Sequence, residues 1–132
     1  MEARGPQVDP VEGLYRAIHL RQWWNGEVTP PRPRSAAFNW PSFSVNIASI
    51  IGEAGAIRHL EQVLGCPEGA IVAFNCGLAR GLGFDARRER DPKYPNNDAH
   101  ANVYFEGLNS TRKKQAKKLA REHCRTVRAP QF

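Results

Sequence analysis

The sequence predicts an α+β domain in which a mixed or antiparallel sheet of four or five strands carries two main helices on one side. Short segments of alternating or continuous apolar residues, such as 43–47 and 70–74, predict the strands. Apolar residues at helical spacing predict helices over residues 53–64 and 110–125. Only one part of the chain has the strand–helix–strand order of a parallel crossover, so a doubly wound fold is not expected.

The composition is that of one globular domain. The chain has 132 residues, of which 41% are hydrophobic and 24% charged, and a chain of this length buries a sizeable core. We expect an extended lead-in over residues 1–12 and one domain over residues 13–132. No apolar run approaches the roughly 20 residues that span a bilayer, and the first residues lack the apolar segment of a secretion signal. These features predict a cytoplasmic protein that does not act at a membrane.

The first half of the chain predicts two strands separated by a long loop. Residues 13–18 alternate imperfectly between apolar and polar types and predict the first strand, and residues 19–24 predict a short turn or helix. Residues 25–41 contain four prolines and predict an irregular stretch, and loops of that length are often functional. Residues 43–47 alternate with period two, which is typical of a strand with one buried face.

The second half predicts one helix, three strands and the C-terminal helix. The helix over residues 53–64 stops at Gly65 and Pro67, two residues that end helices. The later expected elements are a buried strand at 70–74, a glycine-rich helix or turn at 76–84, a charged edge strand at 84–90, a loop at 91–98 and a strand at 99–106.

The excess of positive charge lies in the C-terminal segment. Residues 110–132 contain eight of the nineteen lysines and arginines and a single acidic residue, a net charge of +7 (8 − 1), whereas residues 1–109 carry −1 (11 − 12). Charge confined to one element is typical of a surface that binds a polyanion. We therefore predict a nucleic-acid-binding or accessory protein whose basic helix, at residues 110–125, contacts DNA or RNA.

The basic helix has an apolar stripe and a cationic remainder. One helical face is expected to dock on the domain, and it consists of Ala116, Leu119, Ala120, His123, Cys124 and Val127. The residues expected to contact phosphates are Lys113, Lys114, Lys117, Lys118, Arg121 and Arg125. A purely solvated helix, an acidic protein surface in a larger complex, and an anionic membrane are the alternatives. The stripe of small residues disfavours the membrane.

Two arginines of the proline-rich stretch extend the predicted interface. Arg32 and Arg34 lie among the tryptophans at positions 23, 24 and 40. Aromatic rings interleaved with arginines suit stacking on single-stranded bases. The same rings would equally well fix the loop to the core, and we expect that role for at least two of the three tryptophans.

His100 and Arg16 are the candidate catalytic residues. His100 follows Asp98 where a polar loop runs into a strand, a setting in which an imidazole can act as general acid or base. Arg16, on the first strand, could hold a phosphate or carboxylate. The alternatives are a histidine that bonds a turn and an arginine that packs its stem on the strand. If both are catalytic, the sequence predicts a small enzyme acting on RNA or on a nucleotide.

Nothing in the sequence predicts a cofactor or a metal site. The glycines between positions 77 and 83 match neither a dinucleotide fingerprint nor a Walker loop. Cys66, Cys76 and Cys124 form no C-x-x-C pair, and their spacing from the histidines matches no common zinc pattern.

Two resemblances add to these predictions. The chain resembles a small uncharacterised bacterial protein family with no assigned activity, through the motifs Leu14–Arg16, Ser35–Phe38, Ser44–Ile47, Asp91–Pro92 and Asn97–Ala101, followed by a basic helix. That resemblance spans residues 14–124 and implies one domain but no mechanism. The chain is also faintly similar to NAD-consuming transferase toxins, through Arg16, Ser35 and Asn46, without their further motifs.

Overall fold

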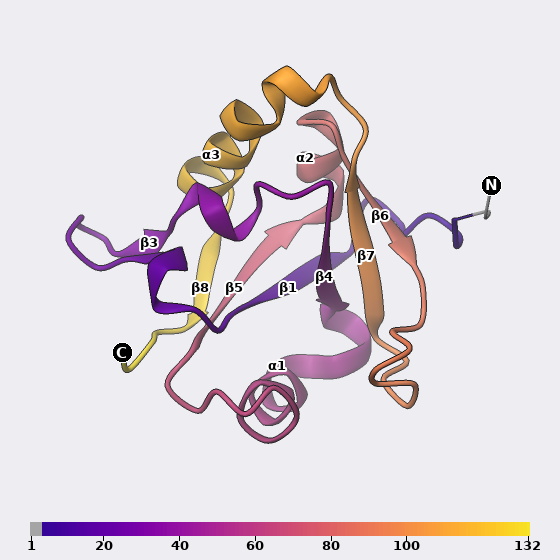
Figure 1. Ribbon diagram of the computed structural model, residues 1–132. Helices are drawn as coiled ribbons and strands as arrows, with labels where there is room; N and C mark the ends of the chain where they lie inside the picture. The colour runs from indigo at the N-terminus through magenta and orange to yellow at the C-terminus, as the bar shows by residue number, and fades with distance from the viewer. Residues whose placement is uncertain (1–3) are drawn as a thin grey trace.

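The computed structural model describes residues 4–132 and shows an α+β fold. One six-stranded antiparallel sheet, a two-stranded sheet and two main helices make up the structure (Figure 1). The strand count is therefore higher than the four or five predicted, because two short strands and a C-terminal strand were not expected. Among the described residues, no helix is long and apolar enough to cross a membrane.

The six-stranded sheet has the order β6-β7-β4-β1-β5-β8, and every neighbouring pair is antiparallel. Its strands are β1 (Gly13–Ile18), β4 (Ser42–Ile47), β5 (Ala70–Asn75), β6 (Phe84–Arg88), β7 (His100–Phe105) and β8 (Arg125–Arg128). Since β4 and β5 are each antiparallel to β1, they run parallel to one another on either side of it. The predicted crossover thus exists, with the first strand inserted into it.

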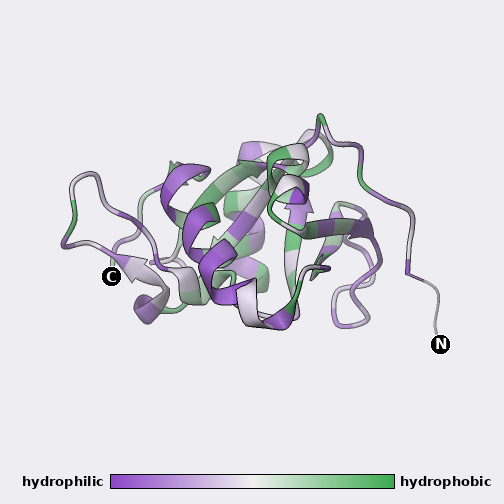
Figure 2. Ribbon diagram, turned by 90° about the horizontal axis from the view of Figure 1, so that it is seen from above, coloured by the Kyte–Doolittle hydropathy of each residue, from purple (hydrophilic) through white to green (hydrophobic). Residues whose placement is uncertain are grey.

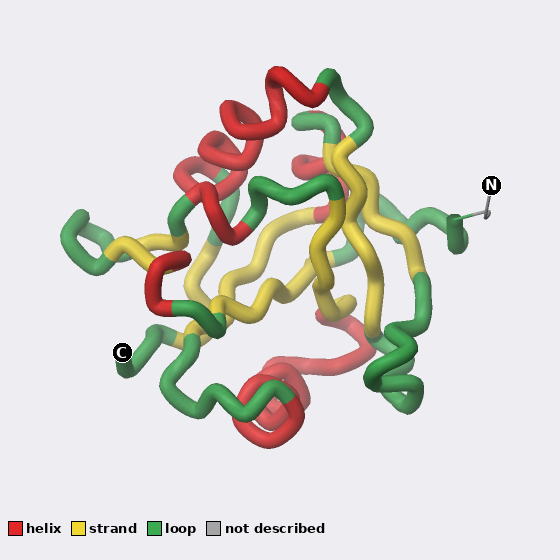
Figure 3. The backbone as a smooth tube through the Cα atoms, viewed as in Figure 1, coloured by secondary structure: helices red, strands yellow, loops and turns green. Residues whose placement is uncertain are grey.

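Helices cover both faces of the sheet, which corrects the prediction that they lie on one side (Figure 3). The helix α1 (Ala48–Arg58) continues into a π-helical segment, η3 (His59–Val63), on one face, and α2 (Cys76–Gly81) and α3 (Arg112–Glu122) cover the other. The reason lies in β5, where every residue from Ala70 to Phe74 is buried. A strand that is apolar on both faces must be covered on both.

Two clusters of buried side chains correspond to these two layers. The larger lies on the side of α2 and α3 and includes Leu14, Phe43 and Leu119. The smaller lies under α1 and includes Leu60 and Ile71. The alternation of side chains along β1 separates the layers, since Leu14, Arg16 and Ile18 are buried on one face while Tyr15 and Ala17 pack against the other cluster.

The C-terminal segment differs from its prediction as a single helix over residues 110–125. A 3₁₀ turn, η4 (Asn109–Thr111), precedes α3, which ends at Glu122 and is followed by the strand β8. Val127 packs against the smaller cluster, and β8 pairs with the otherwise free edge of β5. Pairing along that edge satisfies backbone groups of both strands, an outcome that helical periodicity does not reveal.

The proline-rich stretch is more ordered than predicted. The turn η1 (Arg21–Trp23) and the strand β2 (Trp24–Asn25) lie at its start. The strand β3 (Arg32–Pro33) and the turn η2 (Ser35–Ala37) lie within it. The side chain of Phe38 is fully buried and anchors the stretch in the larger cluster.

The tryptophans divide between core and surface. Trp23 is buried and Trp24 packs against the larger cluster, so two of the three have the core role expected for them. Trp40 is 45% exposed, and its ring lies edge-on to that of Trp23.

The described part of the lead-in covers the edge strand β6. Gln7 forms a bridge with Arg87, and the backbone N–H of Val8 donates to the carbonyl of Ala86. The lead-in over residues 4–12 is therefore hydrogen-bonded to the sheet rather than separate from it. Residues 1–3 of the predicted lead-in lie outside the described residues.

Candidate functional site

The outer side of α3 presents a continuous set of cations. Its exposed basic side chains are Lys113, Lys114, Lys117, Lys118 and Arg121. Among residues 4–132, none of these five forms an ion pair with a carboxylate. Figure 2 shows the hydrophilic residues that predominate along this helix. The cationic surface is thus free to meet an external anion.

The opposite side of α3 holds it on the domain. Ala116, Leu119 and Ala120 are buried in the larger cluster, and Nε of Arg112 donates to Oδ1 of Asn39 over 3.1 Å. The stripe predicted to dock is therefore confirmed for these three residues. Because the apolar face is occupied by the core, only the charged side of the helix meets solvent.

The other predicted interface residues lie at the two borders of α3. Arg125 is exposed but belongs to β8, so its prediction as a helical residue is wrong. Arg32 is half-buried on β3, a strand that packs against α3. Arg34 is exposed, and its Nε donates to the carbonyl of Trp24. The structure therefore keeps the basic loop beside the basic helix.

His100 is buried on the other face of the sheet, where cross-strand pairing aligns it with Asn46 and Tyr15. Its Nδ1 lies 2.6 Å from the carbonyl oxygen of Glu89. Because a carbonyl only accepts, Nδ1 carries a proton, so in the neutral tautomer the lone pair is on Nε2. That Nε2 is buried and has no hydrogen-bond partner.

The carboxylate beside His100 is that of Asp91, not the Asp98 that adjoins it in sequence. Oδ2 of Asp91 lies 3.8 Å from Nε2 of His100, whereas Asp98 is exposed and pairs with Arg90 over 3.0 Å. The alternative role for His100, a histidine that only bonds a turn, also has a matching contact, the bond from Nδ1 to the carbonyl of Glu89.

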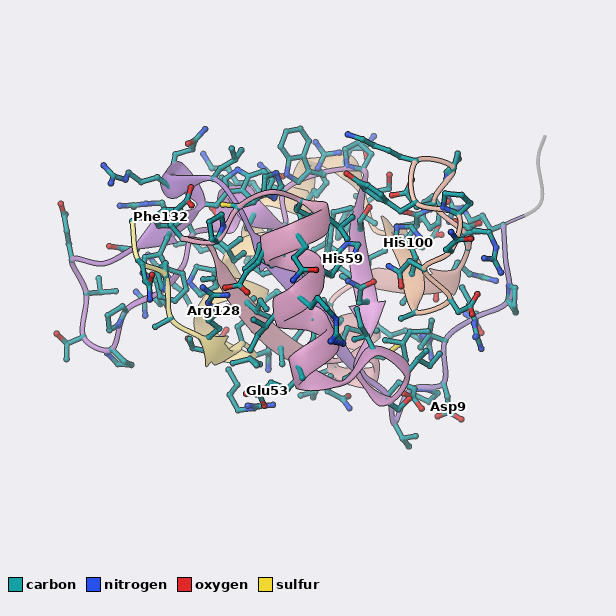
Figure 4. All side chains as sticks on the ribbon, turned by 90° about the horizontal axis from the view of Figure 1, so that it is seen from below. Asp9, Glu53, His59, His100, Arg128 and Phe132 are labelled. Carbon is teal, nitrogen blue, oxygen red and sulfur yellow. The ribbon has the colours of Figure 1, made fainter. Side chains whose placement is uncertain are left out.

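A cavity of about 230 Å³ opens at His100, between the sheet, η3 and the loop after β6. A wider groove of about 690 Å³ between α1 and the same loop shares four residues with it. The residues common to both are His59, Lys93, Tyr94 and Asn97. We call the two together the histidine groove. Figure 4 shows His59 on the helical segment and His100 on the strand side of this face.

His59 is the residue of this groove that sequence reasoning missed. Its ring lies edge-on to that of Tyr94, with 5.7 Å between centroids. Burial lowers the pKa of His59, repulsion from His100 when that ring is protonated lowers it further, and Asp91 partly opposes both. The only local signal is the π-helical turn that begins at His59, a feature that often marks functional positions in helices.

Arg16 is 7% exposed and its guanidinium is held by backbone carbonyls. Nε and Nη2 donate to Ala37 over 3.1 and 3.0 Å, and Nη1 donates to Ser44 over 3.2 Å. Burial lowers the pKa of Arg16 to about 10, so the side chain remains charged at pH 7. No carboxylate pairs with it among the described residues.

Arg16 and His100 both line the 230 Å³ cavity, but they do not contribute in the same way. The guanidinium lies against the rings of Trp23 and Phe43, which belong to the larger cluster. The charge of Arg16 still acts in the groove. Together with burial, it lowers the pKa of His19, which lines the cavity. We therefore treat Arg16 as a buried source of positive field rather than as a phosphate clamp.

The three residues similar to those of transferase toxins are not gathered in one cavity. Ser35 lies in η2, on the side of the larger cluster where Arg16 bonds Ala37. Asn46 lies on the groove side, where its Oδ1 accepts from Nδ2 of Asn97 over 2.7 Å. The sheet separates the two side chains.

The described residues contain no group of three His, Cys, Asp or Glu side chains that could hold a metal ion. Comparisons with models of known families, with curated proteins and with solved structures found no match to this chain. The candidate sites therefore depend on the geometry of the chain itself.

Proposed function

We propose that the protein binds the phosphate backbone of nucleic acid through α3. The observation that carries this proposal is the set of five exposed basic side chains on one helix, none of which has a carboxylate partner within residues 4–132. Backbone contacts provide affinity without reading the base sequence. The expected binding is therefore weakly sequence-specific and strongly dependent on salt.

The energetics of α3 favour an anionic partner. Lys113 and Lys117, Lys114 and Lys118, and Lys117 and Arg121 are like-charged pairs four residues apart, each unfavourable by a few tenths of a kcal/mol. The first turn also places cations at the positive end of the helix dipole. Phosphates lying along the helix would relieve both effects.

The buried stripe of α3 disfavours a membrane as the partner. Amphipathic helices bind a bilayer by inserting their apolar face. In this protein that face, at Ala116, Leu119 and Ala120, is already packed in the core. An acidic surface of another protein remains the competing partner, and it is an outcome of the experiment below.

The test is the affinity for a fluorescent single-stranded DNA of about 20 nucleotides, measured by anisotropy across a salt series. If the five cations of α3 each neutralise one phosphate, the logarithm of affinity falls with the logarithm of salt concentration with a slope of about −3.5. The same measurement with RNA and with duplex DNA ranks the nucleic-acid classes. No detectable binding of any of them at about 50 mM salt would refute the proposal.

A matched pair of double variants locates the interface. Lys117→Gln with Lys118→Gln removes two phosphate contacts, which lowers the magnitude of the slope by about 1.4 and the affinity by about 25-fold at 0.1 M salt. The control, Arg21→Gln with Arg88→Gln, removes the same charge from exposed positions on η1 and β6. Equal losses from both variants would show that net charge, rather than α3, determines binding. If no nucleic acid binds, and the wild-type protein binds a protein partner that the lysine variant does not bind, the protein is instead a subunit of a complex.

A further inference from the structure

We infer that the histidine groove is an RNA-cleaving site in which His100 takes the proton of a ribose 2′-hydroxyl and His59 protonates the leaving oxygen. This activity is separate from the backbone binding proposed for α3. The two surfaces lie on opposite faces of the sheet, since α3 covers the larger cluster while the groove adjoins α1 and η3. The proposal for one surface can therefore be refuted while the proposal for the other is upheld.

The first argument is the state of His100. Its side chain is 6% exposed, its Nδ1–H is engaged by the Glu89 carbonyl, and its Nε2 lies buried without a partner. A buried acceptor left unpaired costs free energy, which a ligand that donates a hydrogen bond would recover. An imidazole oriented through one nitrogen, with the other nitrogen unpartnered beside a cavity, has the arrangement of a general base. Asp91, 3.8 Å from Nε2, stabilises the charge that the ring gains.

The second argument is the distribution of charge along the groove. Asp91 lies at the inner end, beside Nε2 of His100, so a neutral hydroxyl rather than an anion fits there. Lys93 lines both cavities, and Arg58 lines the outer groove, where Asp98 is already paired with Arg90 over 3.0 Å. Arg16 adds its buried field to the inner cavity. A ligand that fits both ends carries a hydroxyl group next to a negative charge.

The third argument is the aromatic wall. Tyr15 lines the inner cavity and Tyr94 lines both, and the outer groove also offers the apolar side chains of Ile50 and Val63, which are 42% and 44% exposed. Aromatic and apolar surfaces are those on which bases stack. A hydroxyl, an adjacent anion and a planar base are found together in a ribonucleotide, and the 2′-hydroxyl distinguishes it from a deoxyribonucleotide.

The reaction balances with these residues alone. Nε2 of His100 accepts the 2′-hydroxyl proton, the 2′-oxygen forms a bond to phosphorus, and the bond from phosphorus to the 5′-oxygen breaks. His59 in its protonated form, which is the minor form at pH 7 because its pKa is lowered, gives its proton to the departing 5′-oxygen. The products are a 2′,3′-cyclic phosphate and a 5′-hydroxyl end, and no electron is transferred. Lys93 and Arg58 lie where they can stabilise the negative charge that grows on the phosphoryl oxygens.

The test uses uridylyl-adenosine, a dinucleotide whose two bases and one phosphate occupy the groove without needing α3. Incubation of the purified protein should release adenosine and uridine 2′,3′-cyclic phosphate, which are separated by chromatography. The dinucleotide that lacks the 2′-hydroxyl should remain intact. Absence of cleavage of uridylyl-adenosine by the wild-type protein would overturn the inference.

Histidine variants assign the activity to the groove. His100→Ala and His59→Ala should each lower the cleavage rate by about 100-fold or more, the usual contribution of one acid–base group. The matched control is His123→Ala, at a half-buried histidine next to the end of α3 and away from the groove. A rate unchanged by both groove variants would refute the assignment and indicate a contaminating nuclease. A rate lost equally in the control would also refute the assignment.

A second measurement covers the case in which His100→Ala does not fold. Uridine 2′-phosphate, added to the wild-type protein, should shift the imidazole proton resonances of His59 and His100 and leave those of His123 unchanged. Shifts confined to His123 would contradict the inference. This chemistry cannot cleave DNA, so the DNA measurements of the α3 experiment are independent of either result.

Discussion

Arg16 shows how one buried residue can connect several elements within one layer of the fold. It lies on β1 between two apolar residues, yet its guanidinium donates to the carbonyls of Ala37 and Ser44. These contacts connect the first strand to η2 and to β4. A buried cation without a carboxylate is costly, and these hydrogen bonds together with the rings of Trp23 and Phe43 offset that cost.

We expect Arg16→Ala to lower the free energy of unfolding by about 3 kcal/mol or more, because it removes the donors to the buried carbonyl of Ala37 and the partly buried carbonyl of Ser44 and opens a cavity. Arg16→Lys should lose less, since it keeps a donor and a charge. Urea unfolding measures both, with the exposed Arg21→Ala as control. A loss for Arg16→Ala within about 0.5 kcal/mol of the control would contradict this role.

At the scale of elements, α3 combines a well-packed inner side with a self-repelling outer side. The packing of Ala116, Leu119 and Ala120 stabilises the helix, while the lysines destabilise it locally. Such a conflict between stability and surface charge is typical of positions retained for function.

Lys117→Glu should therefore stabilise the protein while weakening nucleic-acid binding. It converts the two like-charged pairs with Lys113 and Arg121 into attractive pairs, which we expect to add about 0.5–1 kcal/mol to the free energy of unfolding at low salt. Lys117→Gln, which only removes the repulsion, should add less. Urea unfolding and the DNA anisotropy assay check both effects. A stability decrease in the glutamate variant would show that Lys117 has a structural role.

At the scale of the whole molecule, the sheet separates two surfaces of different character. The α3 face is filled with apolar side chains, whereas the strands β7, β4 and β1 turn His100, Asn46 and Tyr15 toward the groove. The groove places partly buried histidines where protonation is unfavourable. The stability of the whole domain should therefore depend on pH.

Acidification should destabilise the protein in two stages. Burial and neighbouring positive charge lower the pKa values of His59 and His19, so the unfolded chain binds protons first and stability falls as the pH drops below about 6.5. The pKa of Glu89 is also lowered, because hydrogen bonds from Tyr104, Gly5 and Asn102 outweigh the opposing effect of burial. The contribution of Glu89 is present above the unfolded pKa of about 4.3 and is lost as the pH falls through the lower folded pKa.

Urea midpoints at pH 7.5, 5.5 and 4 measure both stages. His59→Gln should flatten the decline between pH 7.5 and 5.5, and Glu89→Gln should flatten the decline at the lowest pH. His123→Gln, outside the groove, serves as the control. A decline of unchanged size in His59→Gln would show that this residue does not contribute to the first stage.

The elements that the sequence predicted well are those whose residues face one consistent environment. The strands at Gly13–Ile18 and Ala70–Asn75 agree with prediction to within one residue. The alternating residue types of the first and the continuous apolar run of the second match their burial in the sheet. The helix expected from residue 53 follows a break at Gly52, whose φ of 69° and ψ of 165° are not helical, and the short helical turn from Ala48 that precedes this break was not predicted. The end of α3 was predicted at residue 125 rather than at Glu122, because β8 forms by pairing with β5, a strand some fifty residues earlier in the chain.

The sequence alone therefore determined the fold class, most of the strands and the location of the cationic helix, since each depends on local periodicity and local charge. Only the tertiary structure decided which residues share a site. Asp91 rather than Asp98 accompanies His100, and His59 joins it from a segment forty residues away. Strand order and helix placement bring these groups together, and no local pattern of residues encodes a contact between such distant segments.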